Sequence, residues 1–256
     1  MLKKLLKYDL LYLFKKTFYC FIVALGLSIL LLIVRNLPDF DFINIVQGST
    51  MFLFVVCLIA FPIFGLIISI TRYNKNMLSD EGYLTHTLPV KKSSLLLSKL
   101  ISNFIFLAAI ILTIVLSIFL AYADFNLFGR FINEIEEMFD VVITTGIEVV
   151  LLILLILNII VYVALYTVLF PMCQTLAAMN DNKKGLMTVI YVVLSLVAIQ
   201  FANNITQYIV LKIFEGTSLV AYEVALLSVY LIVNIAVIVL MYLATLSLLK
   251  KRLNLK

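Results

Sequence analysis

The chain has 256 residues, of which 64% are hydrophobic and only 13% are charged, and its formal net charge is +5. Soluble domains carry roughly a quarter charged residues and about half apolar ones. This composition excludes a soluble globular domain, because a chain this apolar could not cover its own core with polar surface. The composition predicts an all-α integral membrane protein.

The first sixteen residues, MLKKLLKYDLLYLFKK, have the pattern of an imperfect amphipathic helix, with leucines on one side and lysines on the other. Such a helix lies in the membrane interface, where its lysines reach anionic headgroups. We therefore expect an elbow helix over residues 1–16 that leads into the first span. A role in contacting a partner protein is the alternative to a plain anchor.

Six uncharged apolar runs follow, and each is near or above the 17–25 residues that a helix needs to cross the hydrocarbon layer. The fifth run is the shortest and borrows the polar residues Gln200, Asn203 and Asn204 at its outer end. The runs predict a single transmembrane domain, over residues 1–256, with six spanning helices. The predicted spans are Thr17–Val34, Met51–Ile70, Ile101–Ala123, Val149–Phe170, Leu186–Ala202 and Val224–Leu249.

The basic residues indicate the orientation of these spans. With a cytoplasmic N-terminus, 16 of the 19 lysines and arginines fall on the cytoplasmic side, and only Arg35, Arg130 and Lys212 fall outside. Basic residues are enriched in cytoplasmic segments of membrane proteins. We therefore expect both termini in the cytoplasm. This sidedness accounts for the net positive charge, so the charge predicts no binding to nucleic acid.

The polar stretch Arg72–Lys99, between the second and third spans, has a local organisation of its own. Ser79 and the two acids after it are typical of a helix start, where a hydroxyl caps and acids meet the positive end of the dipole. Pro89 ends that short amphipathic helix, since it lacks an N–H and restrains the residue before it. Ser93 and Ser94 are then placed to cap the helix that enters the third span. A small helix lying across the ends of two spans is suited to docking a partner.

Motifs for chemistry are missing from the sequence. None of the eight glycines belongs to the GxxxxGK[ST] loop that binds phosphate. The only histidine, His86, has no neighbouring cluster of cysteines or carboxylates, and Cys20, Cys57 and Cys173 lie in or beside apolar runs. We therefore expect no catalytic site, no metal and no cofactor on this chain, and we predict that it is not an enzyme.

Polar residues inside the spans are few. Asn158 and Asn234 lie near the middle of the fourth and sixth runs and are the candidates for a cargo path. Hydrogen bonding between helices is the alternative and commoner role of such residues. Pro62 and Pro171 predict kinks in the second and fourth spans. Gly65 favours close packing of the second span against a neighbour.

The loop also carries a family resemblance. Asp80-Glu81-Gly82-Tyr83-Leu84, then Leu88-Pro89-Val90-Lys91-Lys92 and Lys99, placed after an amphipathic elbow and two spans, resembles the permease subunits of bacterial ABC exporters of the type-2 class. The resemblance in topology covers the whole chain, whereas the motif is short, and His86-Thr87 departs from it. It implies a coupling helix that fits into a cleft of a separate ATPase subunit. By resemblance the coupling residues are Asp80, Glu81, Gly82, Tyr83, Leu84, His86, Leu88 and Pro89.

The resemblance implies the remaining features of the protein. The partners would be a cytoplasmic ABC ATPase subunit, which would bind the ATP and Mg²⁺, a second permease subunit in a homo- or heterodimer, and the lipid bilayer. The chain would lie in the bacterial cell membrane and export an amphipathic or hydrophobic cargo such as a peptide, toxin, bacteriocin or drug. The alternatives are a membrane scaffold or sensor subunit that transports nothing, and an intramembrane enzyme, which would need a catalytic cluster in the spans.

Overall fold

The computed structural model describes residues 2–38, 40–79, 82, 91–122, 147–179, 184–216 and 218–251. In this part of the chain the regular structure is entirely helical, and six helices are long and apolar enough to cross a membrane. The prediction of an all-helical chain with six membrane-length helices is therefore confirmed. The helices are α1 (Leu2–Arg35), α2 (Asp41–Tyr73), α4 (Lys92–Tyr122), α6 (Ile147–Ala177), α7 (Lys184–Ile213) and α8 (Leu219–Lys251), with a short π-helix, η1 (Asn74–Leu78), directly after α2.

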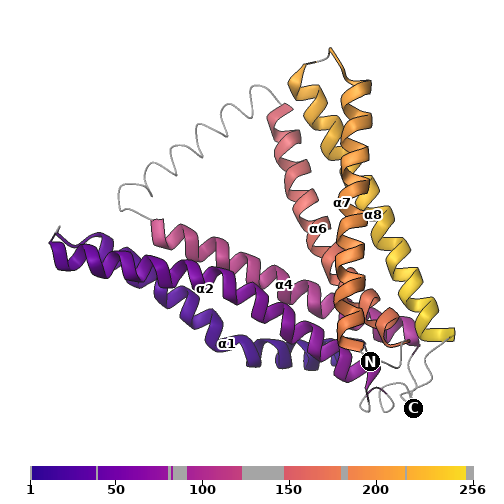
Figure 1. Cartoon of the computed structure of the whole chain (residues 1–256), viewed down its shortest axis with the longest axis horizontal. Coiled ribbons are helices and arrows are strands. Elements are labelled where there is room, and N and C mark those ends of the chain that lie inside the picture. The colour runs from indigo at the N-terminus through magenta and orange to yellow at the C-terminus, as the bar shows by residue number, and fades with distance from the viewer. Residues whose placement is uncertain are drawn as a thin grey trace. The chain divides into compact units, whose positions relative to one another are not determined.

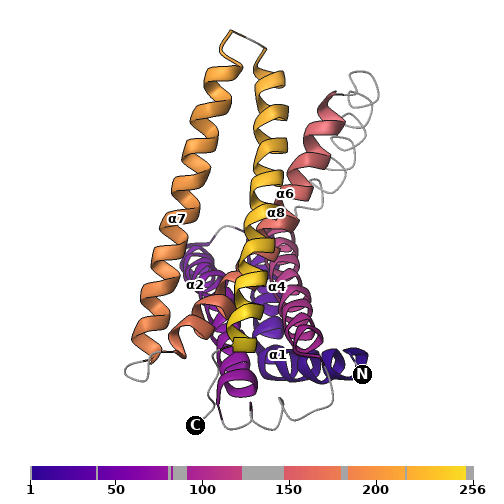
Figure 2. The ribbon, with the colours of Figure 1, turned by 90° about the vertical axis from the view of Figure 1, so that its right-hand side faces the viewer.

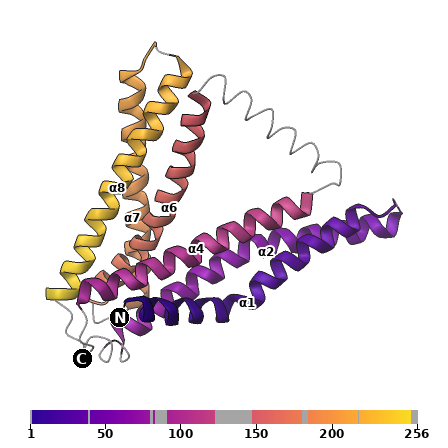
Figure 3. The ribbon, with the colours of Figure 1, turned by 180° about the vertical axis from the view of Figure 1, so that it is seen from behind.

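The helices are longer than the apolar runs that predicted them. The second run begins at Met51, whereas α2 begins at Asp41, and α7 continues eleven residues beyond Ala202 to Ile213. Hydropathy locates the part of a helix that can lie in hydrocarbon, while the backbone hydrogen bonds continue through polar residues on either side. The predicted elbow and first span likewise form one helix, α1, which bends along its length (Figures 1 and 3). Its placement at the membrane interface stays a prediction.

The chain divides into two compact units. The first unit contains α1, α2 as far as Arg72, and α4 from Ile101 onward. The second unit contains η1 and the residue before it, α4 as far as Leu100, and α6, α7 and α8. Both helices that flank the loop are thus shared: their long apolar parts belong to the first unit, and their loop-side ends belong to the second.

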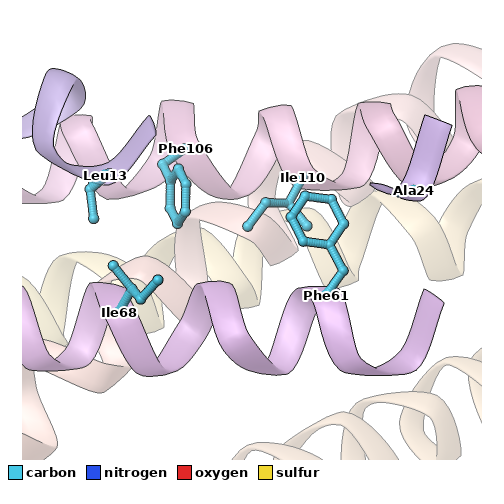
Figure 4. Close-up of a cluster of buried hydrophobic side chains, with 6 residues drawn as sticks. All are labelled: Leu13, Ala24, Phe61, Ile68, Phe106 and Ile110. Carbon is cyan, nitrogen blue, oxygen red and sulfur yellow. The ribbon is translucent and has the colours of Figure 1, made fainter. Parts of the chain in front are cut away.

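In the first unit α1, α2 and α4 lie side by side (Figures 1 and 3). Large side chains from α2 and α4 interleave between these two helices, and α1 adds residues at both ends of the cluster (Figure 4). Gly65 lets α2 approach α4 closely, because a Cβ there would overlap Ile110 Cδ1. The cluster consists of Leu13, Ala24, Phe61, Ile68, Phe106 and Ile110.

In the second unit α6 packs against both α7 and α8, and α7 also packs against α8 (Figure 2). The main apolar cluster is formed by Leu165, Leu169 and Cys173 of α6 with partly buried residues of α7 and α8. α6 bends near its C-terminal end, where Pro171 lies (Figure 2). A proline inside a helix removes one backbone hydrogen bond and clashes with the carbonyl one turn earlier, so the predicted kink has its expected cause.

Candidate functional site: the base of the loop between α2 and α4

The loop between α2 and α4 begins with a change of helical geometry. At Asn74 the α-helix gives way to the single π-helical turn η1, and Ser79 after it is extended. The Ser79 hydroxyl donates to the Lys75 carbonyl (2.7 Å), which satisfies one of the carbonyls that a helix end leaves open. Single π-helical turns are rare and occur frequently at functional sites. Nothing in residues 74–78 predicts this turn, because they are also compatible with an ordinary α-helix.

Gly82 is the one residue of the predicted coupling helix that the structure describes. It is buried, and its N–H donates to the Ser79 carbonyl (2.6 Å). A Cβ at Gly82 would lie 2.9 Å from the backbone carbon and oxygen of Met77, and backbone atoms cannot move aside as a flexible side chain can. A glycine is therefore required where the chain folds back against η1.

The loop returns to the bundle at Lys91. The Lys91 carbonyl accepts hydrogen bonds from the N–H groups of Ser94 (2.9 Å) and Leu95 (3.2 Å), and α4 begins at Lys92. The predicted cap at Ser93 and Ser94 is thus displaced by two residues, because both serines already lie in the first turn. Helix ends are the least certain part of any such prediction.

Both ends of the loop are buried in the second unit. Tyr73 and Met77, where the loop begins, and Leu96, where it ends, have exposed fractions of 1%, 0% and 0%. They pack with side chains near the C-terminal ends of α6 and α8. We name this cluster the loop base; it consists of Tyr73, Met77, Leu96, Leu100, Val168 and Leu249.

A hydrogen bond from a charged side chain joins the start of α4 to the C-terminal end of α8. The Lys92 ammonium donates to the backbone carbonyl of Leu249 (3.0 Å). That carbonyl belongs to the last turn of α8, where carbonyls have no partner inside the helix and the helix dipole is negative. A lysine from the first turn of α4 thus serves as the C-terminal cap of α8. The loop is tied to α8 by this bond as well as by packing.

Arg72, which precedes Tyr73 in the chain, belongs to the first unit and makes two contacts with α1. The Arg72 guanidinium lies 3.3 Å from a carboxylate oxygen of Asp9 in α1, and it stacks 4.1 Å from the ring centre of Tyr12. The Asp9 side chain is only 4% exposed. The sequence signal was present, because Asp9 is the only acid among the first 38 residues, but 63 positions separate it from Arg72.

The other predicted coupling residues lie outside the described residues. These are Asp80, Glu81, Tyr83, Leu84, His86, Leu88 and Pro89. Their role in coupling therefore stays a prediction. The described structure places both attachments of their segment in one cluster, the loop base, together with the C-terminal end of α8.

The two candidate cargo residues are both buried at helix contacts of the second unit. The Asn158 amide donates to the carbonyls of Leu154 (2.9 Å) and, across to α8, of Leu227 (3.0 Å). Asn234 is 1% exposed, and its Nδ2 atom has no hydrogen-bond partner among the described residues. The hydrogen bond from Asn158 to Leu227 joins two helices, which is the alternative role considered for these asparagines in the sequence analysis. The path itself stays a prediction.

Metal binding by the described residues is a separate question. Among them, no group of three or more histidine, cysteine, aspartate or glutamate side chains lies close enough to hold a metal ion. What the geometry provides is a loop whose two ends share one packed base. No family model, curated protein or solved structure matches the chain.

Proposed function

We propose that this multi-pass membrane protein is the permease subunit of an ATP-driven exporter, and that its loop 72–99 docks a separate cytoplasmic ATPase. The observation that supports this best is the loop base. A partner that pulls on the loop would act through Tyr73 and Met77 on one side and Leu96 on the other. All three pack with the C-terminal ends of α6 and α8.

In the proposed mechanism two permease subunits pair in the membrane, and each receives one ATPase on its loop. ATP binding draws the two ATPases together, and the loops follow. The loop base then transmits this displacement to α6 and α8, with Lys92 holding the end of α8. Transport requires that the nucleotide-bound partner bind the two conformations of the permease with different free energies.

The cargo class follows from the apolar character of the spans. The six helices carry mostly hydrocarbon side chains, and an 18-residue stretch in each has a mean hydropathy between 2.2 and 3.0. An amphipathic or hydrophobic molecule suits such surroundings better than a small ion, because a bare charge is costly to move into hydrocarbon. We propose a peptide-like cargo, released on the side of the membrane opposite the ATPase.

The test is co-purification of the full chain from its native membranes in mild detergent. The double variant Glu81→Arg with Leu84→Asp should lose an ATPase subunit that the unmodified chain retains. The matched control is Phe214→Asp with Glu215→Arg, which introduces the same kinds of change after α7, on the predicted opposite side of the membrane. This control should keep the partner.

Two results would contradict the proposal. If no ATP-hydrolysing subunit co-purifies with the unmodified chain under conditions that preserve its dimer, the exporter assignment fails. If an ATPase co-purifies but its activity in vesicles is independent of any cargo, the chain is a scaffold or sensor subunit.

A further inference from the structure

A pocket of about 350 Å³ lies between α6 and α7 in the second unit. It opens at the surface, since Tyr166 and Val197 in its wall are 41% and 62% exposed. Half of the lining side chains are apolar and half are polar, and none is charged. The lining residues are Tyr162, Leu165, Tyr166, Leu196, Val197, Ile199, Gln200 and Asn203.

The polar side chains come from both helices. Tyr162 and Tyr166 lie one turn apart on α6, and Gln200 and Asn203 lie one turn apart on α7. Residues three and four positions apart share a helix face, so each helix contributes a pair of polar groups to the pocket. Both amides lie near the middle of α7, which continues beyond the predicted fifth span to Ile213.

Asn203 is the informative residue of this pocket. It is 8% exposed, and its Oδ1 atom is buried without a hydrogen-bond donor among the described residues. Its backbone carbonyl has a distant donor in the Tyr230 hydroxyl (3.4 Å). The neighbouring Gln200 amide donates to Asn204 Oδ1 (3.2 Å) instead. A buried acceptor without a donor is unfavourable, so the site favours a ligand that supplies one.

The chemistry of the lining narrows the class of ligand. An ion would find no side chain of opposite charge among the lining residues, and its desolvation would be uncompensated. A purely hydrocarbon chain would leave the amides and the phenols without new partners. A ligand with an apolar body and an N–H group satisfies both halves of the lining. To accept this N–H, the Asn203 oxygen would have to turn toward the pocket about the terminal torsion, which is soft.

We propose that this pocket binds an amphipathic peptide segment, with its apolar side chain against Leu196 and Val197 and a backbone N–H donated to Asn203. The binding site rests on the pocket and on Asn203. Its use as a cargo site on the export route rests on the proposed function.

The test uses two photoreactive probes on the purified chain in lipid nanodiscs, without any ATPase. One probe is an N-lauroyl-leucine methyl ester that carries a diazirine and whose single amide N–H is its only donor, and the other is the analogue in which an ester oxygen replaces that N–H. Mass spectrometry measures how much of each probe is attached to peptides of α6 and α7. The amide probe should label these peptides about tenfold more than the analogue, the factor expected for one hydrogen bond in apolar surroundings.

Three variants make the test specific. Asn203→Leu should label equally with the two probes, because the acceptor is gone. Gln207→Leu, which removes an exposed amide of the same helix outside the pocket lining, should keep the preference for the amide. Leu196→Trp fills the pocket from its apolar wall and should lower labelling by both probes, which covers the case in which Asn203→Leu fails to fold.

Equal labelling of the unmodified chain by the two probes would overturn the inference, as would an equal loss of preference in Gln207→Leu. Failure of this site is distinguishable from failure of the exporter assignment. The chain with Glu81→Arg and Leu84→Asp should keep its labelling, because the probe experiment involves no ATPase. If an ATPase co-purifies with the chain but the chain labels equally with the two probes, the proposed function stands and the proposed peptide-binding site is wrong.

Discussion

In the unit of α1, α2 and α4, aromatic rings fill the space between the helices, whereas in the unit of α6, α7 and α8 neutral amides are buried at the contacts. Phe21 and Phe61 meet edge to face at 4.9 Å, and Phe14 meets Phe106 at 5.7 Å. Among the described residues the first unit buries one side-chain amide, Asn103, whereas the second unit buries several, some of which have an atom without a partner in the described structure. These partly unpartnered amides are on Asn158, Asn203 and Asn234.

The difference indicates how each unit is suited to its role. Ring contacts and close approach at a small residue stabilise helix packing in hydrocarbon, where the hydrophobic effect between helices is weak. Buried amides with an open acceptor or donor leave free energy to be gained from a ligand or from another arrangement. We therefore expect the first unit to act as a rigid support, and the second unit, which holds the loop base, to respond to partner and cargo.

The largest effect is expected from breaking the ion pair of the first unit. Arg72→Met leaves the Asp9 carboxylate buried without its cationic partner, which costs roughly 3–5 kcal/mol for a buried pair. The thermal unfolding midpoint of the purified chain in detergent should fall strongly. Arg72→Lys keeps the charge but loses the planar group that stacks on Tyr12, so its loss should be smaller. Equal losses in the two variants would show that the charge of Arg72 contributes nothing.

A second change tests the close approach of α2 and α4. Gly65→Val introduces branched carbons where a Cβ alone would already overlap Ile110, and overpacking typically costs about 1–3 kcal/mol. The matched control is Gly26→Val, since a Cβ at Gly26 would have no other atom within 4 Å. The unfolding midpoint should fall in the first variant and stay within error in the second. A similar fall in both would show that the close approach to Ile110 is not the cause, since valine has a higher helix propensity than glycine.

In the second unit, removing the cap of α8 should have a smaller and local effect. Lys92→Met removes a charge-assisted hydrogen bond to Leu249, which is worth about 1.5 kcal/mol. Hydrogen exchange should accelerate in the last turn of α8 while the rest of that helix keeps its protection. Lys91→Met, at the exposed neighbouring position, should leave exchange unchanged. Unchanged exchange in Lys92→Met would mean that packing alone holds the helix end.

The smallest effects distinguish two buried asparagines. Asn158→Leu removes the bond to Leu227 and should cost about 0.6 kcal/mol, the average for such bonds between membrane helices. Asn234→Leu removes an amide nitrogen that has no acceptor in the described structure, so stability should be unchanged or slightly increased. Thermal unfolding of both variants under one condition makes the comparison. The reverse order would show that Asn234 makes the more important interhelical contact.

The helices of both units could be predicted from hydropathy, because an apolar run long enough to cross the hydrocarbon layer rarely forms anything but a spanning helix. Their ends could not be predicted in the same way. Asp41–Thr50 contains several polar residues and still extends α2, and Gln200 and Asn203 lie inside α7 where the apolar run had suggested an end. Hydropathy scores each residue against lipid, whereas a helix continues as long as its backbone bonds can form.

The loop base shows a different limit of sequence reasoning. The loop was recognisable from its charge, Pro89 and short motif. Its attachment to α8 through Lys92 and Leu249 joins residues 157 positions apart, and no local pattern encodes such a pair. At Gly82, which the sequence analysis places within the short loop helix, the structure supplies a reason for a glycine that the sequence does not show, the nearby Met77 backbone.

We propose that the loop docks an ATP-hydrolysing partner. Site-specific photocrosslinking in native membranes can detect this contact directly. A benzoylphenylalanine replaces Tyr83 in the loop or, as the control, the exposed Tyr208 on α7. The account predicts that Tyr83 crosslinks to an ATPase subunit and that Tyr208 does not. Crosslinks from Tyr83 that contain only lipid or a second copy of this chain would contradict the account.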